Sequence, residues 1–328
     1  MKPRRPVQLA CALLGALVLC IGSANFAGAA PRTLSAADDG AKVVQQSQPN
    51  GQMLDVTMQS PAVGANVGMR LLLPPGWTPE ATRTWPVLYL LPGCCEPKDF
   101  RAWTELTDIA AFAKDKNVLI AMPTDGANGN FSDWWNYGKY GPPDWEKFHL
   151  DEMRQILERN YHAGQKRAVA GLSAGAYGAM EYASRRPGMF QAAAAFSGTP
   201  NIRSMFGDFG VAVGNFRTDQ DQDALWGDPI AQADIWKAHN PYDNAENLRG
   251  TRLFISTGNG FPGPLHLITD NGLNMFEMPA LPNSLMFVNK LNRLGIPITT
   301  HFYGPGTHMW GYWIHELKRA WPLLTQGF

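Results

Sequence analysis

Short apolar runs alternate with stretches of helical periodicity along most of the chain. Eight apolar or alternating runs predict strands, at 54–58, 67–73, 86–91, 118–122, 167–172, 192–196, 252–256 and 298–303. Runs in the middle of the chain are almost continuously apolar, as expected for strands that are buried on both faces of a sheet. Five stretches repeat their apolar residues with a helical period and predict helices, at 104–114, 144–159, 174–186, 282–294 and 311–324.

The order of these elements predicts the fold class. Helices alternate with strands from the third predicted strand onward, which is typical of an α/β protein. We therefore predict an α/β-hydrolase fold: a mostly parallel, eight-stranded sheet flanked by helices and opened by an antiparallel hairpin. We expect no large separate cap domain, and the loop-rich stretch 199–243 is expected above the carboxyl ends of the strands.

The first 29 residues have the pattern of a secretory signal peptide. Lys2, Arg4 and Arg5 precede the apolar stretch 9–21, and Ala27-Gly28-Ala29 follows as a cleavage site. We therefore expect a secreted or cell-envelope protein with no stable membrane anchor. Residues 30–50 are polar and small and are expected to form a flexible lead-in, followed by one catalytic domain over 51–328. A lipoprotein signal at Cys20 is the less favoured interpretation, because the bulky Leu19 precedes it.

Charge and cysteine content narrow the function classes. The formal net charge is zero, so nucleic acid is not an expected partner. Cys11 and Cys20 lie in the predicted signal peptide, which leaves only the adjacent Cys94 and Cys95. Two neighbouring cysteines do not form a zinc site of the usual spacing, and no metal or cofactor is predicted.

The motif Gly171-Leu172-Ser173-Ala174-Gly175 marks a candidate nucleophile. It lies between a predicted strand and a predicted helix, where a tight turn exposes the serine hydroxyl. The two glycines leave room for a strained backbone and for close packing of helix on strand. Ser173 is therefore the predicted nucleophile, against the alternative of a structural serine in a Gly/Ala-rich turn.

His308 is the predicted base, because it follows the last predicted strand in a glycine-rich loop, where this fold places its histidine. A carboxylate is needed to orient the imidazole, and both Asp270 and Glu277 precede His308. The residues alone leave these two open. For the oxyanion, we expect the backbone N–H groups of Ala174 and Cys94 to be the donors. A disulfide between Cys94 and Cys95 and two reduced thiols are both open.

Several motifs together resemble the esterase D superfamily, and within it the secreted antigen 85-type mycolyltransferases and their actinobacterial esterase relatives. The resemblance extends roughly over 54–321. Its motifs are Leu88-Tyr89-Leu90-Leu91-Pro92-Gly93, Phe131-Ser132-Asp133-Trp134-Trp135, 171–175, and Gly306-Thr307-His308-Met309-Trp310-Gly311-Tyr312-Trp313.

The resemblance implies an α/β-hydrolase with a Ser-Glu-His triad, which favours Glu277 over Asp270. It also implies Cys94 and Ala174 as oxyanion donors and places Trp310 and Trp134 near the substrate groove. The chain departs from the mycolyltransferases at two positions, where they carry Asp in place of Pro92 and Arg in place of Cys95. Proline has no polar side chain to bind a sugar, so trehalose is disfavoured as the acceptor.

Three functions follow from the sequence. The preferred one is a secreted serine carboxylic-ester hydrolase that acts on an ester or acyl-lipid small molecule through an acyl-enzyme on Ser173. The alternative is an acyltransferase that passes the acyl group to trehalose or another cell-envelope sugar. A non-catalytic binding protein on the same fold is the third.

Overall fold

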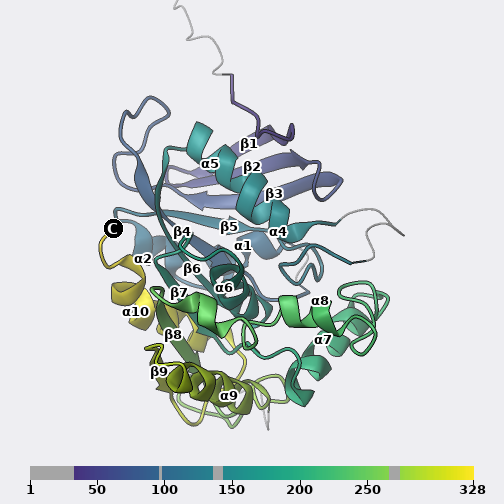
Figure 1. Ribbon diagram of the computed structural model, residues 1–328. Coiled ribbons are helices and arrows are strands. Elements are labelled where there is room, and N and C mark those ends of the chain that lie inside the picture. The colour runs from purple at the N-terminus through teal and green to yellow at the C-terminus, as the bar shows by residue number, and fades with distance from the viewer. Residues whose placement is uncertain (1–32, 96–97, 136–142, 266–273) are drawn as a thin grey trace, which may run out of the picture. The chain divides into compact units, whose positions relative to one another are not determined.

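A mixed β-sheet forms the centre of the protein. The computed structural model describes residues 33–95, 98–135, 143–265 and 274–328. Within them the sheet has nine strands in the order β1-β2-β3-β5-β4-β6-β7-β8-β9. Figure 1 shows β1 at one edge and β9 at the other. The strands are β1 Lys42–Asn50, β2 Met53–Ser60, β3 Ala65–Leu72, β4 Trp85–Leu91, β5 Leu119–Pro123, β6 Ala163–Leu172, β7 Ala192–Phe196, β8 Arg252–Thr257 and β9 Thr299–Phe302.

The pairing of these strands confirms the predicted α/β arrangement. The pairs β1/β2, β2/β3 and β3/β5 are antiparallel. Every pair from β5/β4 to β8/β9 is parallel. Each of the eight predicted strands lies on one of β2 to β9. Because the parallel strands run in one direction, the residues at their carboxyl ends meet at one edge of the sheet.

Strand β1 was not predicted from the sequence. The prediction of eight strands and of a flexible lead-in over 30–50 is wrong for residues 42–50, which pair with β2. Nearly all of its side chains are exposed and most are polar, so no apolar alternation marks the strand in the sequence. Backbone hydrogen bonds to β2 hold it at the edge of the sheet.

Two hydrophobic cores cover the two faces of the sheet. Successive side chains of a strand point to opposite faces. Val87, Tyr89 and Leu91 of β4 accordingly lie in one core, and Leu88 and Leu90 lie in the other. The helices that cover the first core are α4 Trp145–Lys147, the π-helix η1 Phe148–Met153, α5 Arg154–Asn160, α6 Ala174–Arg185 and α9 Ala280–Arg293. Those that cover the second are α1 Asp99–Leu106, α2 Ile109–Ala113 and α10 Trp310–Thr325.

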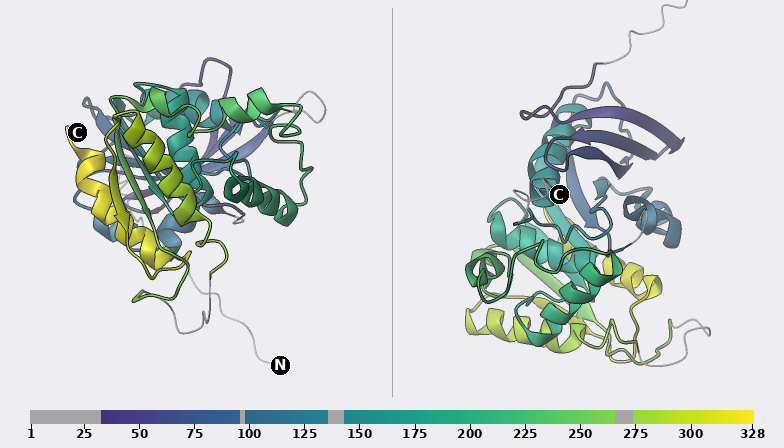
Figure 2. Two further views of the ribbon diagram at one scale, coloured as in Figure 1. Left: turned by 60° about the horizontal axis from the view of Figure 1, so that its bottom comes forward. Right: turned by 90° about the vertical axis from the view of Figure 1, so that its right-hand side faces the viewer.

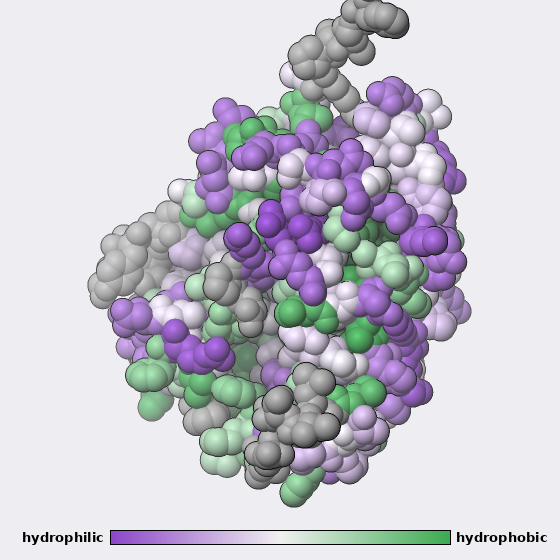
Figure 3. All heavy atoms as spheres, turned by 180° about the vertical axis from the view of Figure 1, so that it is seen from behind, coloured by the Kyte–Doolittle hydropathy of each residue, from purple (hydrophilic) through white to green (hydrophobic). Residues whose placement is uncertain are grey.

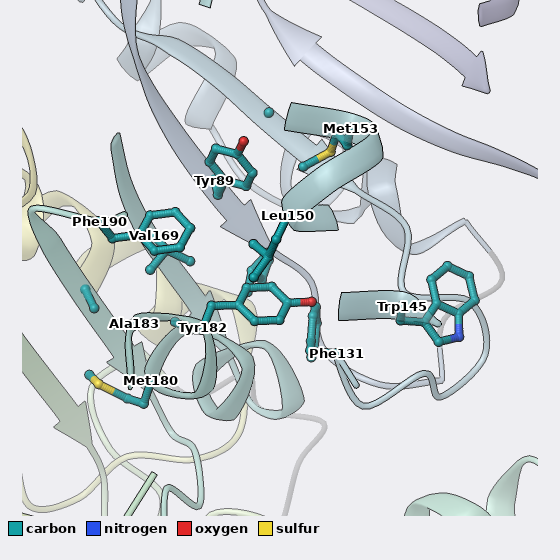
Figure 4. Packing of buried hydrophobic residues seen from close by; sticks show 14 of the residues in the cluster. Tyr89, Phe131, Trp145, Leu150, Met153, Val169, Met180, Tyr182, Ala183 and Phe190 are labelled. Atoms are coloured by element: carbon teal, nitrogen blue, oxygen red, sulfur yellow. The ribbon is translucent and has the colours of Figure 1, made fainter. Parts of the chain in front are cut away.

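The larger core contains many aromatic side chains. Figure 4 shows Tyr89 of β4 beside Phe190, and their ring centroids lie 5.5 Å apart in an edge-to-face arrangement. In the same view Tyr182 of α6 reaches toward Phe131, 6.0 Å away between ring centroids. Such pairs contribute about 0.5–1.5 kcal/mol each beyond the area they bury. The first pair joins β4 to the segment before β7, and the second joins α6 to the loop that contains Phe131.

The helices differ from the predictions at two places. The predicted helix 104–114 is divided into α1 and α2, because Thr107 between them has extended backbone angles. The stretch 199–243 contains two helices that were not predicted, α7 Met205–Arg217 and α8 Ala233–Ala238. It belongs to the same compact unit as the rest of Leu34–Phe328. In the right panel of Figure 2 the purple strands β1 and β2 and the yellow-green helix α9 lie at opposite ends of this unit.

Among the described residues, no helix combines the length and the apolar composition that crossing a bilayer requires. The predicted signal peptide, residues 1–29, lies outside the described residues.

Candidate active site

Ser173 lies at the sharp turn between β6 and α6. Its φ of 54° and ψ of −119° are strained for a residue with a side chain. The two glycines of the motif make the turn possible: a Cβ on Gly171 would lie 2.1 Å from the carbonyl oxygen of Gly175, and a Cβ on Gly175 would lie 2.3 Å from that of Pro92. The backbone N–H of Ser173 donates to the carbonyl of Phe196, 2.9 Å away, and ties the turn to β7.

His308 lies beside Ser173, on the loop between β9 and α10. Its Nε2 atom is 2.9 Å from Ser173 Oγ, and its Nδ1 atom is 2.8 Å from Glu277 Oε2. An ionised carboxylate only accepts hydrogen bonds, so Nδ1 carries the proton and Nε2 presents its lone pair to the serine hydroxyl. The ring packs edge-on against Trp313, with centroids 4.8 Å apart.

Glu277 is fully buried, just before α9. Its Oε1 atom accepts from the hydroxyls of Ser197 (2.8 Å) and Thr257 (2.9 Å) and from the backbone N–H of Gly258 (2.7 Å). Burial alone would raise the pKa of Glu277. The hydrogen bond and charge of His308, with the Gly258 N–H and the Ser197 hydroxyl, outweigh it and hold the pKa below its usual value.

Three donors that were not predicted from the sequence surround Glu277, and we call them the Glu277 cradle: Ser197, Thr257 and the N–H of Gly258. Ser197 directly follows β7 and Thr257 ends β8, so both lie at the carboxyl ends of neighbouring parallel strands. Each follows directly after a predicted strand, which is the one signal in the sequence that could have found them once the two strands were known to be neighbours. Asp270, the other predicted acid, lies outside the described residues.

The two predicted oxyanion donors both line the cavity beside Ser173. Ala174 begins α6, and the first N–H groups of a helix have no partner within the helix. Among the described residues, no acceptor is found for the backbone N–H of Ala174 or of Cys94. The N–H of Cys95 donates to the carbonyl of Ala127 (2.9 Å), and the sulfur atoms of Cys94 and Cys95 are joined as a vicinal disulfide.

A cavity of about 670 Å³ opens in front of Ser173 and His308. A drug-sized ligand occupies a site of this size. Most of its lining is apolar, from α1, α7 and the loops around them and around 265, 275 and 310: Leu106, Ile202, Phe206, Val211, Val213, Leu265, Met275, Phe276, Met309, Trp310 and Trp313. Several of these are exposed at the surface, including Leu106, Met275 and Phe276. Figure 3 shows apolar residues around a recess in the lower half of the face it presents.

The structure separates the two tryptophans that were predicted near the substrate. Trp310 lines the cavity and packs edge-on against Trp103 and Trp313, with centroids 5.4 and 5.2 Å away. Trp134 does not line it. Its side chain is buried and its indole N–H donates to the carbonyl of Gly129, 3.0 Å away. The prediction that Trp134 lies at the substrate is therefore corrected: its side chain packs within its own loop.

One group of side chains has the composition of a metal site. Glu146, Glu181 and His239 are buried, with ligand atoms within 4.8 Å of one another. The guanidinium of Arg185 already compensates the carboxylates, since its Nε lies 2.7 Å from Glu146 and 3.5 Å from Glu181. A bound cation would be repelled by this arginine, so we assign the group to an internal ion-pair network.

Two mycobacterial relatives resemble this chain in sequence. The esterase Rv1288 of Mycobacterium tuberculosis (strain ATCC 25618 / H37Rv) is 30% identical over 278 residues, which cover 82% of this chain and 58% of that protein. The chain therefore spans little more than half the length of that relative. The diacylglycerol acyltransferase/mycolyltransferase Ag85A of Mycobacterium leprae (strain TN) is 29% identical over 253 residues, which cover 74% of this chain and 75% of that protein.

Solved structures show the same fold. Mycobacterium tuberculosis MPT51 superposes with a TM-score of 0.64 at 23% identity, over 80% of this chain and 93% of that one. The serine hydrolase FphF of Staphylococcus aureus superposes with a TM-score of 0.63 at 18% identity, over 83% of this chain and 97% of that one. The model of the Esterase family matches residues 60–324, which is most of the chain. That match identifies this chain as a member of the Esterase family.

Proposed function

We propose that this chain is a serine carboxylic-ester hydrolase whose nucleophile is Ser173. One observation carries the proposal: Ser173, His308 and Glu277 form a hydrogen-bonded series with separations of 2.9 and 2.8 Å at the mouth of an apolar cavity. A serine hydroxyl is a weak nucleophile alone, and a neighbouring base oriented by a third group activates it. The Esterase family match and the mycobacterial relatives support the same class of reaction.

The reaction begins when Ser173 Oγ attacks the ester carbonyl while His308 Nε2 takes the hydroxyl proton. Glu277 keeps the imidazole oriented and stabilises its positive charge. The N–H groups of Ala174 and Cys94 donate to the oxyanion of the tetrahedral intermediate. The alcohol leaves with the proton from His308, and an acyl-enzyme remains on Ser173. Water, deprotonated by His308, then attacks the acyl carbon. The bond from that carbon to Ser173 Oγ breaks, the acid leaves, and His308 returns the proton to Oγ.

The test is hydrolysis of 4-nitrophenyl butyrate by the wild type and by Ser173→Ala. We expect the variant to lose at least about 10³-fold in kcat. A fluorophosphonate probe should label the wild type at Ser173. Equal rates for the two proteins would overturn the proposal, and a folded wild type that the probe does not label would favour a non-catalytic binding protein.

Acyl transfer is the second candidate, because Ag85A of Mycobacterium leprae bears the name of an acyltransferase. Both reactions use the same acyl-enzyme and differ in whether water or a hydroxyl of another molecule accepts the acyl group. Pro92 and Cys95 favour water, because neither offers a charged group to bind a sugar. Incubation with trehalose and an acyl donor separates the two: a trehalose ester formed above the hydrolysis background would support transfer.

We also propose that the chain is exported and cleaved after Ala29. The basic and apolar segments of the first 29 residues support this. Expression in an exporting host should release a protein whose first residue is Ala30, measured by intact mass and N-terminal sequencing. A product that keeps Met1 and stays inside the cell would contradict the proposal.

A further inference from the structure

Arg217 is an unusual member of the cavity lining. The described residues around the cavity include no Asp, Glu or Lys, and apart from His308 the lining has one ionisable basic side chain, Arg217. It is the last residue of α7, the helix that contributes Phe206, Val211 and Val213 to the same lining. A guanidinium stays charged at every physiological pH, so the cavity has a fixed positive charge on one side.

The position of this charge relative to the catalytic group is limited by two contacts. The guanidinium carbon of Arg217 lies 5.8 Å from the centre of the Phe276 ring, over its face. The Phe276 ring centre lies 6.2 Å from that of His308. The guanidinium is therefore at most 12.0 Å from the imidazole centre, which is within reach of one small ester molecule bound at Ser173.

Arg217 has no acidic partner among the residues whose side chains the structure describes, a set that leaves out Asp208 and Phe209: none of those carboxylates lies within 4.0 Å of its guanidinium. Other arginines in this region are paired. Arg203, shortly before α7, lies 2.7 Å from Asp243, and Arg185 lies 2.7 Å from Glu146. Phe276 contacts Arg217 only through the face of its ring, which leaves the N–H donors at the edge of the guanidinium available.

We infer that the cavity binds esters that carry an anionic group, a carboxylate or a phosphate, and that Arg217 is the residue that selects them. The inference deepens the proposed ester hydrolase and rests on it. A guanidinium binds a carboxylate or phosphate through two parallel hydrogen bonds, and an apolar wall such as Phe276 strengthens that contact by excluding water from one side. Arg217 is exposed, so the selectivity it gives is expected to be moderate and sensitive to salt.

The experiment compares two substrates that differ only in charge. Mono-4-nitrophenyl glutarate ends in a carboxylate where 4-nitrophenyl pentanoate ends in a methyl group. The readout is the ratio of their kcat/KM values. We expect Arg217→Gln to lower this ratio about five-fold to ten-fold, mainly through KM for the glutarate, and Arg217→Glu to lower it further. Added salt should lower the ratio of the wild type and leave that of Arg217→Gln nearly unchanged.

A second arm places the charge on the alcohol side. The butyrate ester of 4-hydroxybenzoate is compared with that of 4-hydroxybenzamide, with the same variants. A fall of the ratio in Arg217→Gln in either arm supports the inference. The arm in which it falls shows whether Arg217 binds the anionic group on the acyl part or on the alcohol part of the ester. Arg83→Gln is the matched control, because Arg83 also lies over an aromatic ring, that of Trp85, and does not line the cavity.

The outcomes separate this inference from the proposed function. Hydrolysis of 4-nitrophenyl pentanoate that does not depend on Ser173 would overturn the ester hydrolase itself. Hydrolysis that depends on Ser173, with ratios that Arg217→Gln and Arg83→Gln change equally or not at all in both arms, would overturn only the role of Arg217.

Discussion

The Nδ1 atom of His308 lies 2.8 Å from Oε2 of Glu277, although the carboxylate is fully buried and the imidazole borders the cavity. A buried charge is costly unless it is paired and hydrogen-bonded. Glu277 meets this condition, because the cradle donates hydrogen bonds to its Oε1 atom and His308 donates one to its Oε2 atom. The consequence is a carboxylate that stays ionised and faces the imidazole in one orientation.

Replacing Glu277 by Gln should lower kcat about 10²-fold to 10⁴-fold with a smaller change in KM. The amide removes the negative charge that stabilises the imidazolium, and it can turn its NH₂ toward Nδ1 and favour the wrong tautomer. The measurement is steady-state hydrolysis of 4-nitrophenyl butyrate. Asp270→Asn, the competing acid from the sequence, should stay within a few-fold of the wild type, and a larger loss for Asp270→Asn would transfer the role to Asp270.

Ser197→Ala tests the cradle. The variant removes one of the three hydrogen bonds that the cradle makes to Glu277 Oε1, beside a longer one of 3.5 Å from the Tyr303 hydroxyl. Hydrogen bonds to a charged group contribute about 1.5–3 kcal/mol each. We expect the pKa of Glu277 to rise toward its usual value. The acidic limb of the kcat profile should then move to higher pH, while KM changes little.

Ser284→Ala is the matched control for the cradle. Ser284 is a buried serine on α9 whose hydroxyl has no hydrogen-bond partner among the described residues. Its removal should leave the pH profile unchanged. If Ser197→Ala and Ser284→Ala gave identical profiles, the cradle would have no part in holding Glu277.

The sequence predicted the parts of the site that rest on local backbone patterns. Ser173 was found from a motif between a strand and a helix, and His308 from a glycine-rich loop after the last strand. The sequence left the choice between Glu277 and Asp270 open. The path of the chain between β8 and α9 brings Glu277 to His308, and no local sequence pattern marks that path. Ser197 became recognisable only once β7 and β8 were known to be neighbours, since hydrogen bonding across strands leaves no periodic signal.

Strand β1 and helix α7 were missed for a related reason. Strand β1 has polar side chains on both faces, so it lacks the alternation that marks a half-buried strand. Helix α7 contains Gly207, Gly210 and Gly214, and glycine lowers helix propensity by about 1 kcal/mol per residue. The packing of α7 over the cavity offsets that cost. A sequence pattern does not reveal such packing.

Stability should fall as the pH drops from 7 to 5, and His149 should account for part of the loss. Its Nε2 lies 2.8 Å from the carbonyl of Thr124 and its Nδ1 2.6 Å from the Tyr182 hydroxyl, which fits a neutral ring that donates from Nε2. Burial lowers its pKa to about 4. The unfolded chain, with a pKa near 6.5, binds the proton first, so stability is fully present above about 6.5 and lost toward 4.

The loss at pH 5 is about 2 kcal/mol for a histidine with this shift. Urea unfolding at pH 7 and pH 5 measures it. His149→Gln, which does not titrate, should lose about 2 kcal/mol less than the wild type between the two values, while the exposed His315→Gln should lose as much as the wild type. Burial also lowers the pKa of His239 to about 4, so some acid sensitivity remains in His149→Gln. Equal losses in His149→Gln and the wild type would contradict the assignment.

Trp310 and Trp134 should respond differently to substitution, although both belong to the motifs that suggested a substrate role. Trp310→Leu removes an aromatic wall of the cavity, so kcat/KM should fall several-fold for long acyl chains and less for acetate esters. Trp134→Phe keeps the packing but removes the indole donor of the Gly129 carbonyl, which still accepts from the N–H of Ser132; the loss should cost about 0.5–1.5 kcal/mol of unfolding free energy. Its chain-length profile should match the wild type, because the side chain lies outside the cavity lining. The measurements are kcat/KM over 4-nitrophenyl esters from acetate to decanoate and urea unfolding of each variant. A chain-length profile for Trp134→Phe that changed as that of Trp310→Leu did would place Trp134 at the substrate after all.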